Sequence, residues 1–175
     1  MLVELASLER QSGKFAHNYE PGELELNEDR ISIAEPPRVS GRIQQSEAKV
    51  TVSGDITAEL SLECDRCLKP LKIPVSNTFR VEYVTPDVYQ TGQGSELLDE
   101  DLSLSVFDGA VLDIDELVRE QLLLVLPAQA LCGEDCKGLC PVCGGDRNVK
   151  DCKCQEAEID PRWAGLKEIV GQKRD

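Results

Sequence analysis

Histidine, aromatic residues and long apolar runs are all scarce in this 175-residue chain, which has one histidine and only 4% aromatic residues. Because histidine is the usual base for a serine or cysteine nucleophile, such chemistry has one candidate base, His17. No run reaches the roughly 18 apolar residues that a membrane helix needs. The opening MLVELASLERQ has neither the basic start nor the apolar stretch of a secretory signal. We therefore expect a cytoplasmic protein that is not inserted in a membrane.

Basic residues are outnumbered, with 19 Lys and Arg against 33 Asp and Glu and a formal net charge of -14. Such a charge repels nucleic acids and anionic membranes at long range. The acidity is concentrated in residues 81–120, which hold eleven acids and one base. A small basic island precedes this region and contains Arg66, Lys69 and Lys72. We expect these three residues to contact RNA or an acidic partner locally.

Alternating apolar residues predict a β-hairpin. Residues 48–62 and 71–84 both place apolar side chains at every second position, and the link between them contains Cys64 and Cys67. The Ser53-Gly54-Asp55 sequence predicts a bulge or short turn in the first strand. Shorter strands are expected at 2–5, 23–26 and 31–33.

Capping signals predict two helices. Asp113 can cap a helix whose apolar side contains Leu117, Val118 and Leu122, and Pro127 ends it. Asp160 followed by Pro161 is a second helix start, near the end of the chain.

Eight cysteines are the unusual abundance, and six of them lie between Cys132 and Cys154. The CPVCGG sequence, Cys140 to Gly145, is typical of a zinc knuckle, in which a tight turn directs two thiolates at one ion. Gly144 supplies the flexible residue after the second ligand. Zinc requires four ligands, and the other two could be Cys132 with Cys136 or Cys152 with Cys154.

The alternatives are buried apolar cysteines, disulfides or an iron–sulfur cluster. The segment is polar and glycine-rich, so apolar burial could not fold it, whereas zinc binding contributes on the order of 10–16 kcal/mol in small peptides. A structural role for the metal is expected because no histidine accompanies these cysteines.

The pair Cys64 and Cys67 has three interpretations. A thioredoxin-type redox pair would need a helix N-terminus, which a hairpin does not provide. A second knuckle would combine with two C-terminal cysteines and make two four-thiolate sites, binding one or two zinc ions in all. Free thiols beside Arg66 and Lys69 are the third possibility.

These features predict an α+β fold: an antiparallel β-sheet or small barrel built around the Cys-bearing hairpin, with one or two helices and a C-terminal zinc-binding segment. The expected organisation is an α+β domain at 1–130, a zinc-binding segment at 131–156 and a helix at 157–175. No catalytic constellation or phosphate-binding glycine loop is present in the sequence. We therefore expect that the protein is not an enzyme.

The sequence contains four distinctive stretches: LECDRCLKP, the helix ending in LLLVLP, the run CKGLCPVCGGDRN with CKC, and DPRWAGLKEIV. Together they resemble the YceD family of bacterial and plastid proteins. The resemblance extends from about residue 40 to the end, and some branches of the family lack the C-terminal cysteines. It implies a role in the accumulation of 23S ribosomal RNA.

The expected function is thus a non-catalytic factor in large ribosomal subunit biogenesis. Its expected partners are a basic large-subunit ribosomal protein, 23S rRNA or a pre-ribosomal particle, with the acidic 81–120 region contacting the protein. The alternatives are a thiol–disulfide redox protein using Cys64 and Cys67, or a zinc module that binds RNA directly.

Overall fold

The computed structural model describes residues 1–8, 11–46, 49–87, 89 and 104–154. Its contacts form two units. The sheet unit comprises Met1–Glu63 and Pro70–Ala130, and the cysteine unit comprises Cys64–Lys69 and Leu131–Asp175. The helix expected at 157–175 lies outside the described residues. Within the described ranges, no helix is long and apolar enough to span a bilayer.

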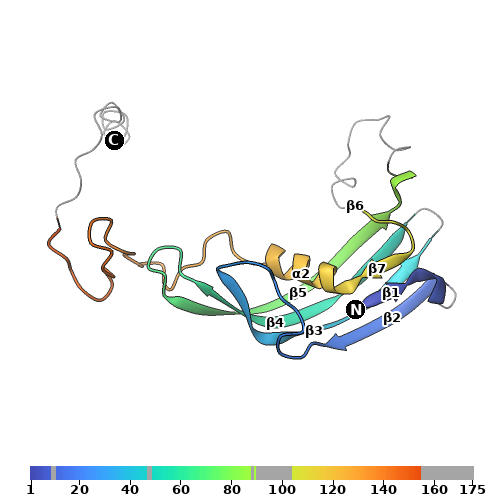
Figure 1. Ribbon diagram of the computed structural model, residues 1–175, viewed down its shortest axis with the longest axis horizontal. Coiled ribbons are helices and arrows are strands. Elements are labelled where there is room, and N and C mark those ends of the chain that lie inside the picture. Colours follow the sequence, from blue (N-terminus) through green and yellow to red (C-terminus); the bar gives the residue numbers. More distant parts are fainter. Residues whose placement is uncertain (9–10, 47–48, 88, 90–103, 155–175) are drawn as a thin grey trace, which may run out of the picture. The chain divides into compact units, whose positions relative to one another are not determined.

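The sheet unit is built on a five-stranded sheet of order β2-β3-β4-β5-β6 (Figure 1). The strands are β2 (Ser12–Asn18), β3 (Ile31–Gln45), β4 (Val50–Glu63), β5 (Pro70–Val84) and β6 (Leu104–Val106). All neighbours are antiparallel except β5 and β6, which are parallel. A second, two-stranded sheet pairs β1 (Leu2–Glu4) with β7 (Val111–Asp113). The 3-10 helix η1 (Leu5–Ser7) and the helix α2 (Ile114–Leu124) complete the described elements.

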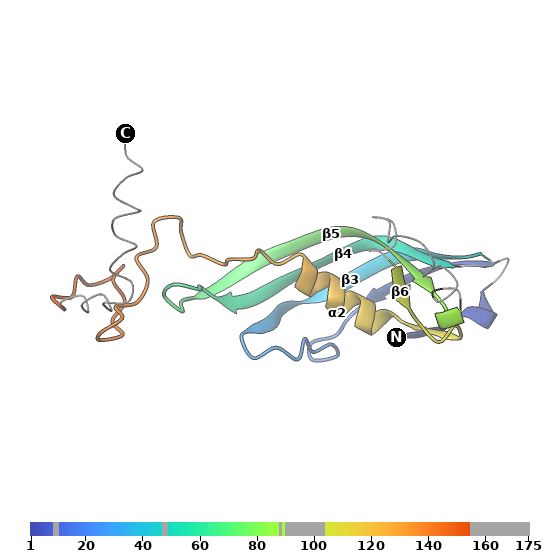
Figure 2. The ribbon, with the colours of Figure 1, turned by 90° about the horizontal axis from the view of Figure 1, so that it is seen from above.

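The predicted hairpin is confirmed. β4 and β5 pair from Val50 opposite Tyr83 to Glu63 opposite Pro70, and the loop Cys64–Lys69 joins them. The alternating apolar residues of both strands share one face, which we call the inner face. Figures 1 and 2 show α2 lying along this face. The core formed there includes Val52, Ile56, Leu60, Val75, Phe79, Leu117, Val118 and Leu122. The α+β prediction is therefore confirmed. The edge strands of the five-stranded sheet are β2 and β6.

The helix also begins as predicted. The Asp113 carboxylate accepts hydrogen bonds from the backbone N–H groups of Asp115, at 2.9 Å, and Glu116, at 3.3 Å. These bonds satisfy two of the donors that the first turn leaves unpaired. On the inner face of the sheet, Gln121 of α2 accepts a hydrogen bond from the Asn77 side chain at 3.3 Å. A polar contact thus fixes the helix within an otherwise apolar layer.

The N-terminal strand predictions are partly wrong. Residues 23–26 are not a strand, although Leu24 and Leu26 are buried in the core. Burial alone explains their apolar pattern, because these residues contact the core without joining a ladder. The strand at 31–33 is the start of the 15-residue β3, which continues past Pro36 and Pro37 with two register shifts. The shifts accommodate residues that cannot donate to the ladder.

The bulge predicted at Gly54 is also wrong, because β4 pairs continuously with β5 through this residue. Phe15, Gly41, Gly54 and Phe79 lie directly opposite one another across four strands. A Cβ atom on Gly54 would overlap the backbone oxygen of Ser40 and lie 2.9 Å from the Gly41 Cα. The Phe15 and Phe79 rings cover the two glycines instead. Gly54 therefore permits close backbone packing, which a sequence alone does not distinguish from a bulge.

Candidate metal centre

Cys64 and Cys67 lie in a tight turn between β4 and β5. The N–H of Leu68 donates to the Cys64 carbonyl at 2.9 Å, and the N–H of Cys64 donates to the Lys69 carbonyl at 2.9 Å. Leu68 adopts a φ of 59°, in the left-handed region. A leucine in this conformation costs roughly 1–2 kcal/mol relative to the ordinary region. The turn therefore requires a conformation that its sequence does not favour.

Cys140 and Cys143 lie in a second turn with the same bonds. The N–H of Gly144 donates to the Cys140 carbonyl at 2.8 Å, and the N–H of Cys140 donates to the Gly145 carbonyl at 2.8 Å. Gly144 has a φ of 70°, at the position that Leu68 occupies in the first turn. The expectation that Gly144 gives this turn its conformation is confirmed. Cys64 and Cys67 thus form a second knuckle in which leucine replaces the usual glycine.

The structure brings the eight cysteines into two groups of four. One group is Cys64, Cys67, Cys132 and Cys136, and the other is Cys140, Cys143, Cys152 and Cys154. Within each group all sulfur atoms lie within 4.8 Å of one another. Each knuckle therefore has its own pair of partners, and both pairs that the sequence left open are used.

The sulfur spacing fits one ion in each group. A tetrahedral ion with sulfur at about 2.3 Å holds its ligands about 3.8 Å apart. In the first group the Sγ atoms of Cys64 and Cys136 are 3.9 Å apart, and those of Cys67 and Cys132 are 3.6 Å apart. All eight cysteines are free of disulfide bonds. Each group could therefore hold a metal ion.

Backbone N–H groups stabilise the thiolate form of cysteines in both groups. In the first group burial opposes ionisation of Cys136, but hydrogen bonds that include the Gly138 N–H lower its pKa. Burial of Cys64 opposes its charged form, but N–H donors of Arg66, Cys67 and Cys132 outweigh burial and lower its pKa to about 6. N–H groups of Cys143 and Val142 lower the pKa of Cys140 to about 6.

Other cysteines of each group show the opposite shift, because hydrogen bonding to a neighbouring cysteine favours their protonated form. Hydrogen bonding with Cys136 is the main cause that raises the pKa of Cys132 to about 12. Hydrogen bonding with Cys143 is the main cause that raises the pKa of Cys154 to about 12. Four thiolates at this spacing repel one another, and a bound cation removes that repulsion.

Asn148 supports the first group, and the sequence interpretation missed it. Its side-chain nitrogen donates to the Cys136 sulfur at 3.4 Å, and its side-chain oxygen accepts from the Lys137 N–H at 2.8 Å. Asp146 orients it by accepting a bond from the same nitrogen at 2.7 Å. Hydrogen bonds to ligands tune and orient metal sites. Only the folded loop identifies Asn148, because asparagine is common in polar loops.

Arg66, one of the residues expected to contact RNA or a partner, forms hydrogen bonds within the cysteine unit. Its guanidinium donates to the carbonyl oxygens of Cys136, at 2.9 Å, and Glu134, at 3.4 Å. Its own carbonyl accepts from the Leu139 N–H at 2.9 Å. Lys69 is exposed in the same unit. Lys72 lies on β5 of the sheet unit, and its ammonium is 2.9 Å from Glu59. A contact of these residues with RNA or a partner stays a prediction.

In the described part of the acidic 81–120 region, several carboxylates form hydrogen bonds or ion pairs with other groups of the sheet unit. Asp113 caps α2, Asp115 accepts a hydrogen bond of 2.6 Å from the Tyr19 hydroxyl, and Glu82 pairs with Lys49 at 2.5 Å. Burial opposes ionisation of Asp115, but bonds from the terminal ammonium and Tyr19 hold its pKa below its usual range. These acids stabilise the sheet unit, so they are less available to an external partner.

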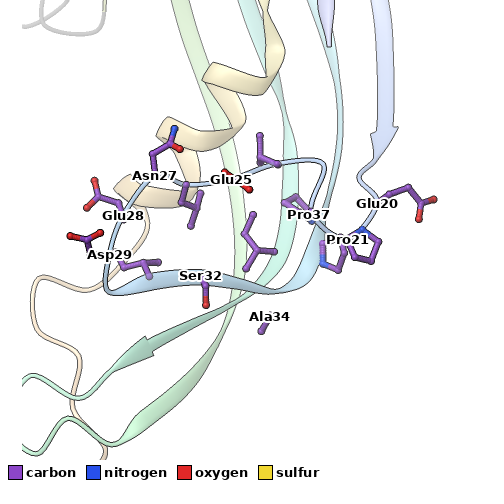
Figure 3. A pocket seen from close by; sticks show the side chains of 15 residues that line it. Glu20, Pro21, Glu25, Asn27, Glu28, Asp29, Ser32, Ala34 and Pro37 are labelled. Carbon is purple, nitrogen blue, oxygen red and sulfur yellow. The ribbon is translucent and has the colours of Figure 1, made fainter.

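A further acidic surface lies outside 81–120, at a pocket of about 620 Å³ between the loop of residues 20–29 and the start of β3. Figure 3 shows Glu28 and Asp29 at one end of this pocket and Glu20 at the other. Leu24, Leu26, Ile31 and Ile33 contribute apolar surface. The pocket thus combines an apolar lining with acidic residues.

Comparison with known proteins places the chain in a family. A family model described as large ribosomal RNA subunit accumulation protein YceD matches residues 52–170. The uncharacterized protein YlbN of Bacillus subtilis is 30% identical over 173 residues, which cover 98% of this chain and 95% of the relative. An uncharacterized protein of Mycobacterium tuberculosis is 29% identical over 179 residues, covering 100% of this chain and 84% of the relative.

A chloroplast protein of Arabidopsis thaliana, described as a large ribosomal RNA subunit accumulation protein YCED homolog, is 24% identical over 152 residues. The alignment covers 75% of this chain and 47% of that protein. No solved structure matches the chain. Since the family model spans more than half of the residues, including all eight cysteines of the two groups, the chain belongs to the YceD family.

Proposed function

We propose that this protein is a cytoplasmic, non-catalytic factor in large ribosomal subunit biogenesis that supports 23S rRNA accumulation or processing. The match of residues 52–170 to the YceD family model, with its ribosomal RNA description, carries the proposal. The surroundings of His17 support a non-catalytic role. Its ring nitrogen is 2.7 Å from Glu23, and its ring packs edge-on against Tyr19. These contacts involve no serine or cysteine nucleophile.

We also propose that each group of four cysteines binds one structural zinc ion. Four thiolates are a common ligand set of structural zinc sites, and both groups provide it without an open position for a reacting water. A polynuclear iron–sulfur cluster would hold its cysteines farther apart, because iron and sulfide atoms separate them. The metal would connect the two chain segments of the first group and order the polar loop of the second.

The same geometry argues against a thiol–disulfide enzyme. Cys64 and Cys67 are both buried, and each faces a cysteine of the C-terminal segment. A reactive cysteine of this class requires access to its substrate.

A basic ribosomal protein is the partner that the charge of this chain favours. Opposite charges accelerate encounter and select partners. The acidic pocket of Figure 3 supports such a contact, since basic side chains with long aliphatic stems match both its acids and its apolar lining.

Depletion of the protein in its host is expected to lower 23S rRNA relative to 16S rRNA, and a plasmid copy should restore the ratio. Northern blots or sequencing of total RNA measure both species. A tagged chain recovered at moderate salt should bring a large-subunit ribosomal protein with it. An unchanged 23S to 16S ratio would contradict the proposed function, whereas recovery of rRNA without any ribosomal protein would contradict only the proposed partner.

A further inference from the structure

We propose that the outer face of the five-stranded sheet binds the phosphate–ribose backbone of double-helical RNA. The binding residues are Lys14, Arg38, Arg42 and Arg80, which we call the basic patch. The choice of RNA as the polyanion rests on the proposed function, whereas the position of the patch rests on the strand register. The patch is separate from the island of Arg66, Lys69 and Lys72.

The strand register places the patch on one face. Lys14 of β2 is opposite Arg42 of β3, Arg42 is opposite Ser53 of β4, and Ser53 is opposite Arg80 of β5. Residues directly opposite in a sheet project from the same side, and neighbouring strands are about 4.8 Å apart. Three cations therefore occupy a row about 14 Å long. Arg38 lies four residues before Arg42 on the same strand, and it projects from the same side.

The patch is exposed and largely unpaired. Lys14, Arg38, Arg42 and Arg80 are all exposed. Among the described residues, the first three form no ion pair. The Arg80 guanidinium is 3.0 Å from Glu82, a carboxylate that also binds Lys49. At least three charges are thus available to phosphates in a protein whose net charge is -14.

Hydroxyl groups and a shallow depression accompany the cations. A hollow of about 730 Å³ is lined by the cations Lys14 and Arg42 and by the hydroxyl residues Ser40, Ser53 and Thr78. Gly41 and Gly54, which we call the glycine row, also line it. Serine and threonine hydroxyls are common donors to phosphate and ribose oxygens. Asp55 also lines the hollow and accepts the hydroxyl proton of Thr78 at 2.7 Å. Ser40 and Ser53, rather than Thr78, are therefore the hydroxyl donors for phosphate.

The residue types favour an RNA helix over a single strand. Single-stranded RNA is bound mainly by stacking its bases on exposed aromatic rings. The aromatic residues of this part of the sheet, Phe15 and Phe79, belong to the row that packs against the core. Double-stranded RNA is instead recognised through phosphates and 2′-hydroxyls. An array of cations and hydroxyls on one face of the sheet suits that contact, and the overall negative charge limits binding to this patch.

The test compares two variants of the full chain with equal net charge. Lys14→Gln/Arg42→Gln removes two patch cations, and Lys69→Gln/Lys72→Gln removes two cations of the sequence-predicted island. The probe is a 20-base-pair RNA duplex, and fluorescence anisotropy gives Kd at several salt concentrations. The patch variant is expected to raise Kd at least about tenfold and to lower the salt slope by roughly 1.8, because each phosphate contact contributes about 0.9 to that slope. The island variant should change neither quantity.

Several results would overturn the proposal. They are the absence of duplex binding at low salt, equal weakening by both variants, and binding of single-stranded RNA or anionic phosphatidylserine vesicles as tightly as the duplex. Both variants are expected to fold, because all four substituted side chains are exposed, and thermal unfolding checks this. If the duplex-binding test fails but depletion of the protein still lowers 23S rRNA, the RNA-binding role of the basic patch is refuted and the proposed function is not.

Discussion

Protein purified without added metal is expected to contain close to two zinc ions per chain, and their removal should unfold the cysteine unit. Residues 131–154 contain almost no apolar core: Val142 is 58% exposed and Val149 is 84% exposed. Zinc binding supplies on the order of 10–16 kcal/mol in small zinc-folded peptides, so no other interaction in this loop compares with it. Metal analysis by mass spectrometry gives the stoichiometry. Hydrogen exchange before and after chelation gives the loss of amide protection.

Cysteine variants separate the two sites. Cys64→Ser/Cys67→Ser and Cys152→Ser/Cys154→Ser should each retain about one zinc ion, because the two ligand groups share no cysteine. Val142→Ser is the matched control, since Val142 lies between two ligands but its side chain is exposed. It should retain both ions. A metal-free protein with a well-protected loop, or a variant that loses both ions, would refute two independent structural sites.

Gly54→Ala is expected to destabilise the sheet unit by about 3 kcal/mol, at the upper end of the usual cost of overpacking. In most strands this replacement is favourable by about 0.5–1 kcal/mol, because glycine loses more conformational freedom on folding. Here the added Cβ would overlap the Ser40 carbonyl oxygen and approach the Gly41 Cα and the Phe79 ring. Two of these neighbours are backbone atoms of β3, so relief requires separation of the paired strands.

Chemical denaturation followed by circular dichroism measures the free energy of unfolding. Gly133→Ala is the control, because no heavy atom lies within 4 Å of its expected Cβ position. The control should leave the free energy of unfolding of the sheet unit unchanged. A Gly54→Ala protein as stable as the original would show that the strands do not pack this closely at the glycine row.

Much of the sheet unit could be predicted locally. The alternating residues of β4 and β5 determine which sides of the hairpin are buried, and Asp113 determines where α2 begins. Each of these signals lies within one element. The length of β3 could not be predicted, because Pro36 and Pro37 are usual strand breakers and only pairing with β4 shows that the strand continues beyond them.

The sequence by itself determined that Cys140 and Cys143 form a knuckle, because their spacing and Gly144 are enough to define the turn. Only the tertiary structure decided which cysteines share a site, since Cys64 and Cys132 are separated by 67 intervening residues and meet through the path of the chain. The basic patch has the same origin. Its side chains come from three strands, and register rather than sequence distance sets their spacing. Local patterns specify turns and faces, whereas contacts between distant segments depend on how the whole chain packs.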